Sequence, residues 1–222
     1  MIIDIVTIFP ELFEILRDHS IIKRAILSKK LELNIHNLRD YSLEKHGKVD
    51  DTIYGGGSGM LLEFPPLYEA IKDLGGFTIL TSPKGKLLNQ EMSLYLSEKE
   101  HITIICGHYE GVDARILEFI DSEISIGDYV LTGGEIPAMV IIDSVTRCLK
   151  GVIKETSLKT DSLYNNLLKQ NEYTKPYDYK GFKVPEVLVS GNHEQIEKFN
   201  KEDSLNETKK KRIDLWEKYN KK

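Results

Sequence analysis

Apolar and polar residues follow two different periods along the first two thirds of the chain. Runs that alternate with a period of two, or that are continuously apolar, predict β-strands at residues 2–9, 31–38, 77–82, 101–107 and 122–127. Between them, apolar residues at helical spacing predict helices at residues 19–30, 65–73, 89–97, 113–119 and 134–149. Strands that alternate with helices are typical of α/β proteins, so we expect a mostly parallel sheet covered by helices.

The last third of the chain has a different pattern. Residues 154–167 are rich in Ser, Thr, Lys and Asn and lack a long apolar face, which predicts a flexible connection. Asn192 is suited to cap a helix that has Glu194 and Glu197 in its first turns, where negative charge favours the helix dipole. We therefore expect a main domain at 1–156, a linker at 157–168 and a small helical domain at 169–222.

Composition is that of a globular protein without a membrane segment. Of the 222 residues, 41% are hydrophobic and 29% are charged, which is ordinary for a chain that buries a sizeable core. The N-terminus has no basic leader, and no apolar run approaches the ~20 residues that a membrane span needs. Cys106 and Cys148 show neither disulfide nor metal spacing, so we expect both to be buried apolar residues of a cytoplasmic protein.

The charge is unevenly distributed. The first 150 residues hold 15 Lys and Arg against 23 Asp and Glu, whereas residues 151–222 hold 15 against 12. A basic run, "KKKR", occupies residues 209–212. Such a run is common on a solvated helix face, but it also suits a polyanion such as RNA.

Three glycine-containing loops follow predicted strands, at residues 81–86, 106–115 and 125–135. In an open α/β sheet the carboxyl ends of the strands are where ligands bind. Glycine permits positive φ and close approach of a ligand to the backbone, so the loops predict a pocket for a nucleoside-like molecule, with plain surface turns as the alternative. Neither a phosphate-binding P-loop nor a G-x-G-x-x-G fingerprint is present. A fourth cluster, "YGGGSGM" at 54–60, is either an anion-binding nest or a flexible loop.

Several longer motifs resemble one family. In order, they are "IFPELF", "YGGGSGM", "GHYEGVDAR", "SIGDYVLTGGEIPAMVIIDSVTR" and "VLVSGNH". Together they closely resemble the bacterial tRNA (guanine-N1-)-methyltransferases, the TrmD family, over nearly the whole chain. The resemblance implies a SPOUT-type α/β fold with a deep C-terminal trefoil knot that binds S-adenosylmethionine, and a homodimer with active sites across the interface. It also implies methyl transfer to N1 of guanosine at tRNA position 37, next to the anticodon.

The resemblance assigns two catalytic residues. Asp161, in "DSL", matches the family's aspartate and is expected to remove the N1 proton. Arg147, in "DSVTR", matches the arginine expected to stabilise negative charge at guanine O6. Taken alone, Asp161 is also suited to cap a turn, and Arg147 is suited to the C-terminal end of a helix.

The resemblance also assigns the binding residues. Those expected at the cofactor are Leu80, Thr81, Ser82, Pro83, Gly107, Tyr109, Glu110, Gly111, Ser125, Ile126, Gly127, Tyr129, Leu131, Gly133 and Gly134. Those expected at the tRNA are Tyr54, Gly55, Gly56, Gly57, Ser58, Gly59 and Asp128. The basic C-terminal domain is expected to hold the anticodon stem-loop. Some members of the family require Mg2+, but we assign no metal ligand.

Two residues depart from the family pattern. His108 stands where many members have Arg, and Ser58 where many have Pro, so a phosphate or ribose contact at His108 would depend on pH. The C-terminal region is shorter than in longer members, which leaves its share of the tRNA contacts open. Three alternatives remain: a SPOUT methyltransferase for another RNA position, an RNA-binding protein without activity, and a general nucleotide-binding module.

Overall fold

The computed structural model describes residues 1–154, 161–163 and 165–221. The chain divides into two compact units, Met1–Ile153 and Lys154–Lys222. The linker expected at 157–168 lies partly outside the described residues.

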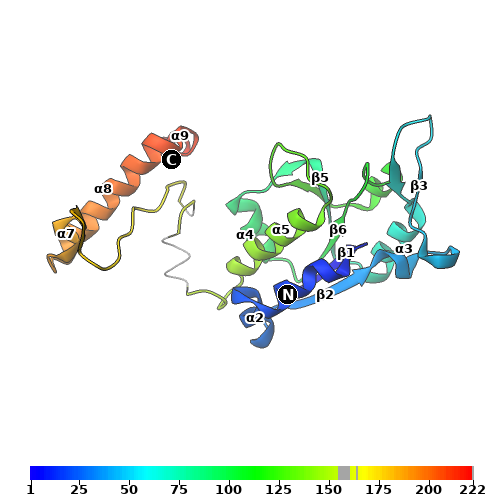
Figure 1. The fold of residues 1–222 in the computed structure, drawn as a ribbon, viewed down its shortest axis with the longest axis horizontal. Coiled ribbons are helices and arrows are strands. Elements are labelled where there is room, and N and C mark those ends of the chain that lie inside the picture. The colour runs from blue at the N-terminus through cyan, green and yellow to red at the C-terminus, as the bar shows by residue number, and fades with distance from the viewer. Residues whose placement is uncertain (155–160, 164, 222) are drawn as a thin grey trace. The chain divides into compact units, whose positions relative to one another are not determined.

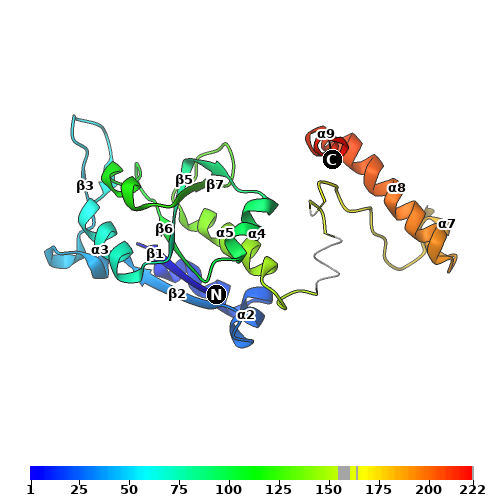
Figure 2. The ribbon, with the colours of Figure 1, turned by 180° about the vertical axis from the view of Figure 1, so that it is seen from behind.

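A five-stranded parallel sheet forms the centre of the first unit. Its strands, in spatial order, are β2 (Glu32–Asn37), β1 (Ile2–Thr7), β6 (His101–Cys106), β5 (Phe77–Leu87) and β7 (Ser122–Ser125). Figure 1 labels β1, β2, β5 and β6, and Figure 2 also labels β7. Every neighbouring pair of strands is parallel, which confirms the sheet predicted from the sequence. Strand β5 is longer than expected, because it continues through an irregularity between Thr81 and Lys86 and still pairs with β7.

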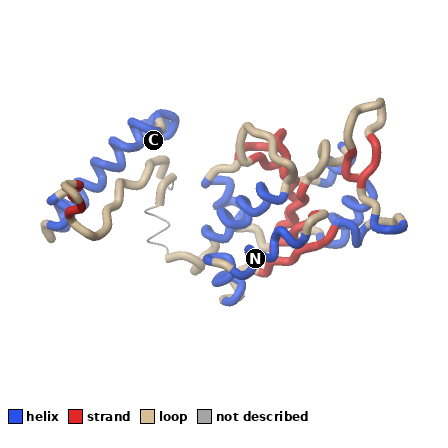
Figure 3. The backbone as a smooth tube through the Cα atoms, viewed as in Figure 1, coloured by secondary structure: helices blue, strands red, loops and turns tan. Residues whose placement is uncertain are grey.

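Helices cover both faces of this sheet. The first face is covered by α2 (Ser20–Leu27), α4 (Gln90–Ser97) and α5 (Glu135–Cys148), and the second by α3 (Phe64–Leu74) and the 3-10 helices η2 (Leu38–Tyr41) and η4 (Ala114–Phe119). Successive residues of a strand point to opposite faces, so Ile3 and Ile5 of β1 are buried against the first layer and Val6 against the second. Figures 2 and 3 show the sheet between these layers. The helix predicted at 113–119 is thus a 3-10 helix rather than an α-helix.

Short elements connect the main ones. They are η1 (Pro10–Phe13), α1 (Glu14–Asp18), η3 (Lys45–Gly47), β3 (Asp50–Thr52) and β4 (Met60–Leu62). Strands β3 and β4 pair in antiparallel fashion, so the glycine-rich segment 53–59 forms the loop of a hairpin. The threading of the chain into a knot stays a prediction.

The second unit is mainly helical over its described residues. Its elements are the strands β8 (Asp178–Tyr179) and β9 (Phe182–Lys183) and the helices α7 (Glu186–Val189), α8 (His193–Lys211) and α9 (Ile213–Asn220). The side chain of Asn192 accepts a hydrogen bond from Gln195 N at 3.2 Å, which confirms the predicted cap of α8. The hairpin of β8 and β9 was not predicted.

A buried carboxylate joins three strands of the main sheet. Asp4 of β1 is only 4% exposed and lies 2.9 Å from Nε2 of His36 on β2 and 2.5 Å from Nε2 of His101 on β6. Burial alone would raise the pKa of Asp4, but hydrogen bonds from His36, His101 and Asn34 outweigh it, so this pKa lies below its usual value. The ionised form of Asp4 therefore stabilises the fold.

Asp4→Asn is expected to lower the free energy of unfolding by about 1–3 kcal/mol at pH 7, because a charged hydrogen-bond acceptor is lost from a buried site. Because the pKa of Asp4 is lowered in the folded state, its ionisation stabilises the fold fully above the unfolded-state pKa of 3.8. This stabilisation is lost as pH falls through the lower folded-state pKa. The difference between Asp4→Asn and wild type should therefore shrink below about pH 4. Urea unfolding of both proteins at pH 7 and pH 3 measures this difference in unfolding free energy. A difference that is the same at both pH values would contradict a stabilising role of ionised Asp4.

Candidate ligand cavity at the sheet edge

A cavity of about 330 Å³ lies at the carboxyl ends of β6 and β7, beside the irregular stretch of β5 between Thr81 and Lys86. Its walls are the loops that follow β6 and β7 together with residues 80–84 of β5. The three glycine-containing segments predicted to converge therefore do lie together, although 81–86 belongs to the strand and not to a loop after it. All fifteen residues that we expected at the cofactor line this cavity. The volume is that of a small-molecule site.

The glycine pair at 133–134 permits two loops to touch. Gly134 N donates a hydrogen bond to Gly107 O at 2.7 Å. A Cβ atom at Gly134 would overlap Thr81 Oγ1 and lie 2.7 Å from Gly107 N. Gly134 has a φ of −83°, which any residue can adopt. Glycine is therefore required here for the close packing of two chain segments, rather than for the left-handed backbone or the ligand contact that the sequence suggested.

A compact turn after β7 forms another wall. The Ser125 hydroxyl donates to Gly127 O at 3.1 Å and accepts from Gly127 N at 3.2 Å. The Tyr129 ring lies directly on Gly127, leaving no room for a Cβ atom, and its hydroxyl donates to Ile126 O at 3.3 Å. These contacts fix the exposed Tyr129 ring at the cavity.

Glu135 is a buried carboxylate behind the cavity wall that the sequence did not predict. It begins α5 and accepts a hydrogen bond from Thr7 Oγ1 at 3.0 Å. Its other oxygen lies 3.7 Å from Nδ1 of His108, which itself lines the cavity. The His108 ring also packs edge-on against Phe9 and Tyr109, so it is held in place from three sides.

The buried thiol of Cys106 lies next to this carboxylate. Burial, and secondarily the charge of Glu135, raises the pKa of Cys106 well above its ordinary value. The thiol therefore stays protonated and is a poor nucleophile. Cys106 is accordingly a core residue, as the sequence predicted.

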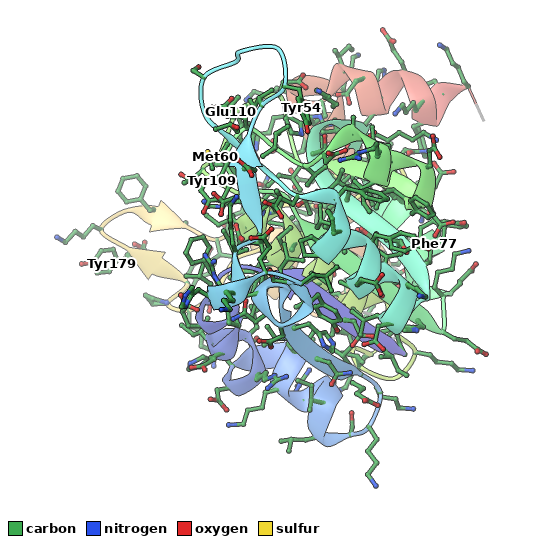
Figure 4. The ribbon with its side chains drawn as sticks, turned by 90° about the vertical axis from the view of Figure 1, so that its right-hand side faces the viewer. Tyr54, Met60, Phe77, Tyr109, Glu110 and Tyr179 are labelled. Carbon is green, nitrogen blue, oxygen red and sulfur yellow. The ribbon has the colours of Figure 1, made fainter. Side chains whose placement is uncertain are left out.

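The glycine-rich loop between β3 and β4 is attached to the cavity wall. Glu110 N donates to Met60 O at 3.0 Å, and Leu62 N donates to Gly111 O at 3.0 Å. The Glu110 side chain covers Gly59, because a Cβ atom there would lie 2.9 Å from Glu110 Oε1. Figure 4 shows Glu110 and Tyr109 beside this hairpin. The expected tRNA residues 54–59 thus lie outside the cavity lining but are joined to it through Glu110.

The tip of this loop is open to solvent. Tyr54 is 99% exposed, and Gly55 and Gly56 have positive φ values of 88° and 84°. No atom lies within 4 Å of a Cβ built on either glycine. The Tyr54 ring is therefore accessible to a binding partner.

The two expected catalytic residues do not line the cavity. Arg147 lies in the last turn of α5, whose first turn forms part of the wall, so thirteen residues of helix place it about 20 Å from Gly134. Asp161 belongs to the second unit, and Asp128 is exposed between the lining residues Gly127 and Tyr129. Within one chain, the first unit does not bring Arg147 to the cavity.

The cavity offers both charges to a ligand. The lining residues that we did not name beforehand are Lys84, His108, Val112, Ala114, Leu117, Glu123, Ile124, Val130, Thr132 and Pro137. Most belong to the three loops or their flanks, so their position in sequence could have suggested them. The carboxylates of Glu110 and Glu123 suit a cationic group of a ligand, and the ammonium group of Lys84 suits a carboxylate. Apolar surface comes from Leu80, Leu131 and Pro137.

Two negative findings concern the described part of the chain. No cluster of three or more His, Cys, Asp or Glu side chains there is arranged to hold a metal ion. In the same residues, no helix is both long and apolar enough to span a membrane.

Comparison with known proteins gives one consistent result. The family model described as tRNA (Guanine-1)-methyltransferase TrmD matches residues 1–218. A tRNA (guanine-N(1)-)-methyltransferase of Finegoldia magna is 50% identical, over 97% of this chain and 94% of the relative. Proteins of the same name from onion yellows phytoplasma and Ruminiclostridium cellulolyticum are 53% and 51% identical, over 98% and 97% of this chain and 91% and 96% of the relatives.

Proposed function

The chain belongs to the tRNA (guanine-1)-methyltransferase TrmD family and is therefore an S-adenosylmethionine-dependent tRNA methyltransferase, and we propose that it methylates N1 of guanosine at position 37. Because the members of this family are tRNA methyltransferases, the match argues against two of the alternatives, an RNA-binding protein without activity and a general nucleotide-binding module. A SPOUT enzyme for another RNA position is the remaining alternative, and the choice of position 37 rests on the resemblance.

The observation that carries the proposal is the cavity at the carboxyl ends of β6 and β7, beside residues 80–84 of β5. Its charges match S-adenosylmethionine, because Glu110 and Glu123 suit the ammonium and sulfonium groups and Lys84 suits the carboxylate. Its apolar surface suits the adenine ring, and the backbone groups of the glycine loops suit hydrogen bonding to a purine edge and a ribose. We therefore assign the fifteen expected residues to donor binding.

The chemistry requires more than donor binding. When bound, the donor supplies a methyl group on an electrophilic sulfonium. Guanine N1 carries a proton at neutral pH and becomes nucleophilic only when that proton leaves. We propose that the Asp161 carboxylate accepts it and that the Arg147 guanidinium stabilises the charge that develops at O6.

The position of Arg147 supports a homodimer with a shared active site. About 20 Å of helix separates Arg147 from the cavity of its own chain, so a second copy is needed to bring the two together. On the same helix Ile136 and Val140 are exposed and lie one turn apart, with Arg147 further along that face. We propose that this face of α5 forms the interface between the two copies.

A complementation experiment tests the shared site. Arg147→Ala chains and Gly134→Val chains, which lack a usable donor cavity, are each expected to be inactive as homodimers. Mixed dimers should regain activity, because one of their two sites combines an intact cavity with an intact Arg147. Methyl transfer after co-expression with two different affinity tags measures this. Activity no higher than in either homodimer would show that Arg147 acts only with its own chain or not at all.

The remaining parts of the site are assigned to the tRNA. We propose that the loop carrying Tyr54 and Gly55–Gly59, with Asp128, contacts the guanosine or its flanking phosphates, and that the basic second unit holds the anticodon stem-loop. Such a site would recognise the guanine base after it is flipped out of the base stack of the tRNA. We place the reaction in the cytoplasm and assign no residue to Mg2+.

The decisive test uses two transcripts. Wild-type protein is incubated with methyl-labelled S-adenosylmethionine and an unmodified tRNA that has guanosine at position 37, and then with the same tRNA carrying adenosine there. Label in the first and not in the second, recovered as N1-methylguanosine, is the expected result. Label at a ribose hydroxyl or at another position would instead favour the alternative SPOUT enzyme.

A further inference from the structure

The second unit contains an aromatic hairpin whose residues have no role in donor binding or in methyl transfer as proposed above. Strands β8 and β9 pair Asp178 with Lys183 and Tyr179 with Phe182. The two residues of its turn, Lys180 and Gly181, both have positive φ values, 55° and 87°, which is the geometry of a tight type I′ turn. Figure 4 shows Tyr179 projecting from this hairpin.

The hairpin exposes its aromatic side chains instead of burying them. Tyr179 is 61% exposed and Phe182 is 82% exposed. Because they are paired directly across the hairpin, both rings lie on the same face. Tyr173 and Tyr177, just before the hairpin, are exposed as well. Two large rings on one exposed face contribute little to folding, so a binding role accounts for them better.

A cation accompanies the rings. Lys180 Nζ lies 5.4 Å from the centre of the Tyr179 ring, within the range of a cation–π contact. Lysine is depleted in the buried centres of protein interfaces, whereas sites for single-stranded nucleic acid combine aromatic rings for stacking with cations for phosphates. The surrounding segment 151–222 also carries more Lys and Arg than Asp and Glu, 15 against 12.

We propose that Tyr179 and Phe182 form a stacking platform for an unpaired base of the tRNA substrate, with Lys180 contacting the adjacent phosphate. The proposal rests on the proposed function for the identity of the RNA. It adds a second RNA contact, separate from the loop that carries Tyr54, which binds a base through its ring face and without sequence preference.

The test compares tRNA binding by full-length variants in which the bulk of the side chains is retained. The double variant Tyr179→Leu, Phe182→Leu is expected to bind tRNA about tenfold more weakly or worse, since stacking on one base accounts for a change of that order. Tyr179→Phe keeps the ring and should stay within about twofold of wild type. Lys180→Gln should weaken binding and reduce the salt dependence by about one phosphate contact.

A matched control exists in the first unit. Tyr95 on α4 is 50% exposed, and Lys99 Nζ lies 4.3 Å from its ring centre, so it is a similar tyrosine–lysine pair in another place. Tyr95→Leu should leave tRNA affinity unchanged. In addition, the double variant should bind a fully paired RNA duplex as well as wild type does, because a duplex offers no unpaired base.

Each outcome decides the proposal. If the double variant binds tRNA like wild type, the platform is overturned. The platform is also overturned if the double variant sediments as a monomer while wild type is a dimer, because the face that carries Tyr179 and Phe182 is then an interface between copies. Should the double variant fail to fold, as judged by circular dichroism, the comparison of Tyr179→Leu with Tyr179→Phe decides in its place. Wild-type methyl transfer is measured in parallel: its absence would refute the proposed function, whereas normal transfer with unchanged variant affinity refutes only the platform.

Discussion

Asp161→Asn is expected to reduce methyl transfer by about 10²–10⁴-fold, the range that loss of a general base produces. Asparagine has the same shape but cannot accept the N1 proton at neutral pH. Affinity for S-adenosylmethionine should remain within about twofold, because Asp161 belongs to the second unit and the cavity belongs to the first. Single-turnover transfer at saturating tRNA, with separate donor titration, measures both quantities.

The dependence of the rate on pH distinguishes a base from a structural residue. With Asp161→Asn the residual rate should rise with pH, because guanine N1 then has to lose its proton without help from the protein. Glu172→Gln is the matched control, since Glu172 is an exposed carboxylate of the same unit, paired with Lys169 at 2.8 Å. That variant should have the activity and the pH profile of wild type. A slow Asp161→Asn enzyme whose profile parallels wild type would contradict the role of Asp161 as the base.

The elements of the first unit were predictable because their patterns are local. The strand at β6 is mostly apolar and buried on both faces, with Ile104 in one layer and Ile105 in the other. The helix at α5 repeats apolar residues at helical spacing, and its observed bounds, Glu135–Cys148, lie within one residue of the expected ones. In contrast, the turn of β8 and β9 depends on positive φ at Lys180, which periodicity does not reveal.

The cavity was predictable in outline but not in its packing. The three glycine-containing segments were expected together at one edge of the sheet, and the structure confirms that all three line the cavity, although 81–86 is part of β5. The contacts of Glu135 with Thr7 and His108 were missed, because these residues come from three segments up to 128 positions apart. The same is true of Gly134, whose role depends on Thr81 and Gly107 rather than on its own neighbours in sequence.

Gly134→Ala is expected to lower the free energy of unfolding by at least about 2 kcal/mol and to weaken donor binding at least tenfold. The backbone φ of −83° at Gly134 is compatible with alanine, but Gly134 is the N-cap residue of α5, where alanine is less favourable than glycine, and this adds to the loss. The main cause is steric. The new methyl group would overlap Thr81 Oγ1 and lie 2.7 Å from Gly107 N and 3.0 Å from Cys106 Cα.

None of these neighbours can move freely. Thr81 Oγ1 donates a hydrogen bond to Ile105 O at 3.2 Å, and Cys106 belongs to the central strand β6. The loops that form the cavity must therefore separate, which breaks the 2.7 Å hydrogen bond from Gly134 N to Gly107 O. Urea unfolding and donor titration measure the two effects.

Two further variants identify the contact responsible. Gly57→Ala is the control, because a Cβ atom there meets nothing closer than 3.4 Å, and it should unfold like wild type. Adding Thr81→Ala to Gly134→Ala removes the overlap with Oγ1 but leaves Gly107 N and Cys106 Cα in place, so it should restore stability only in part. If Gly134→Ala alone bound the donor and unfolded like wild type, the close contact between the two loops would not be what holds the cavity together.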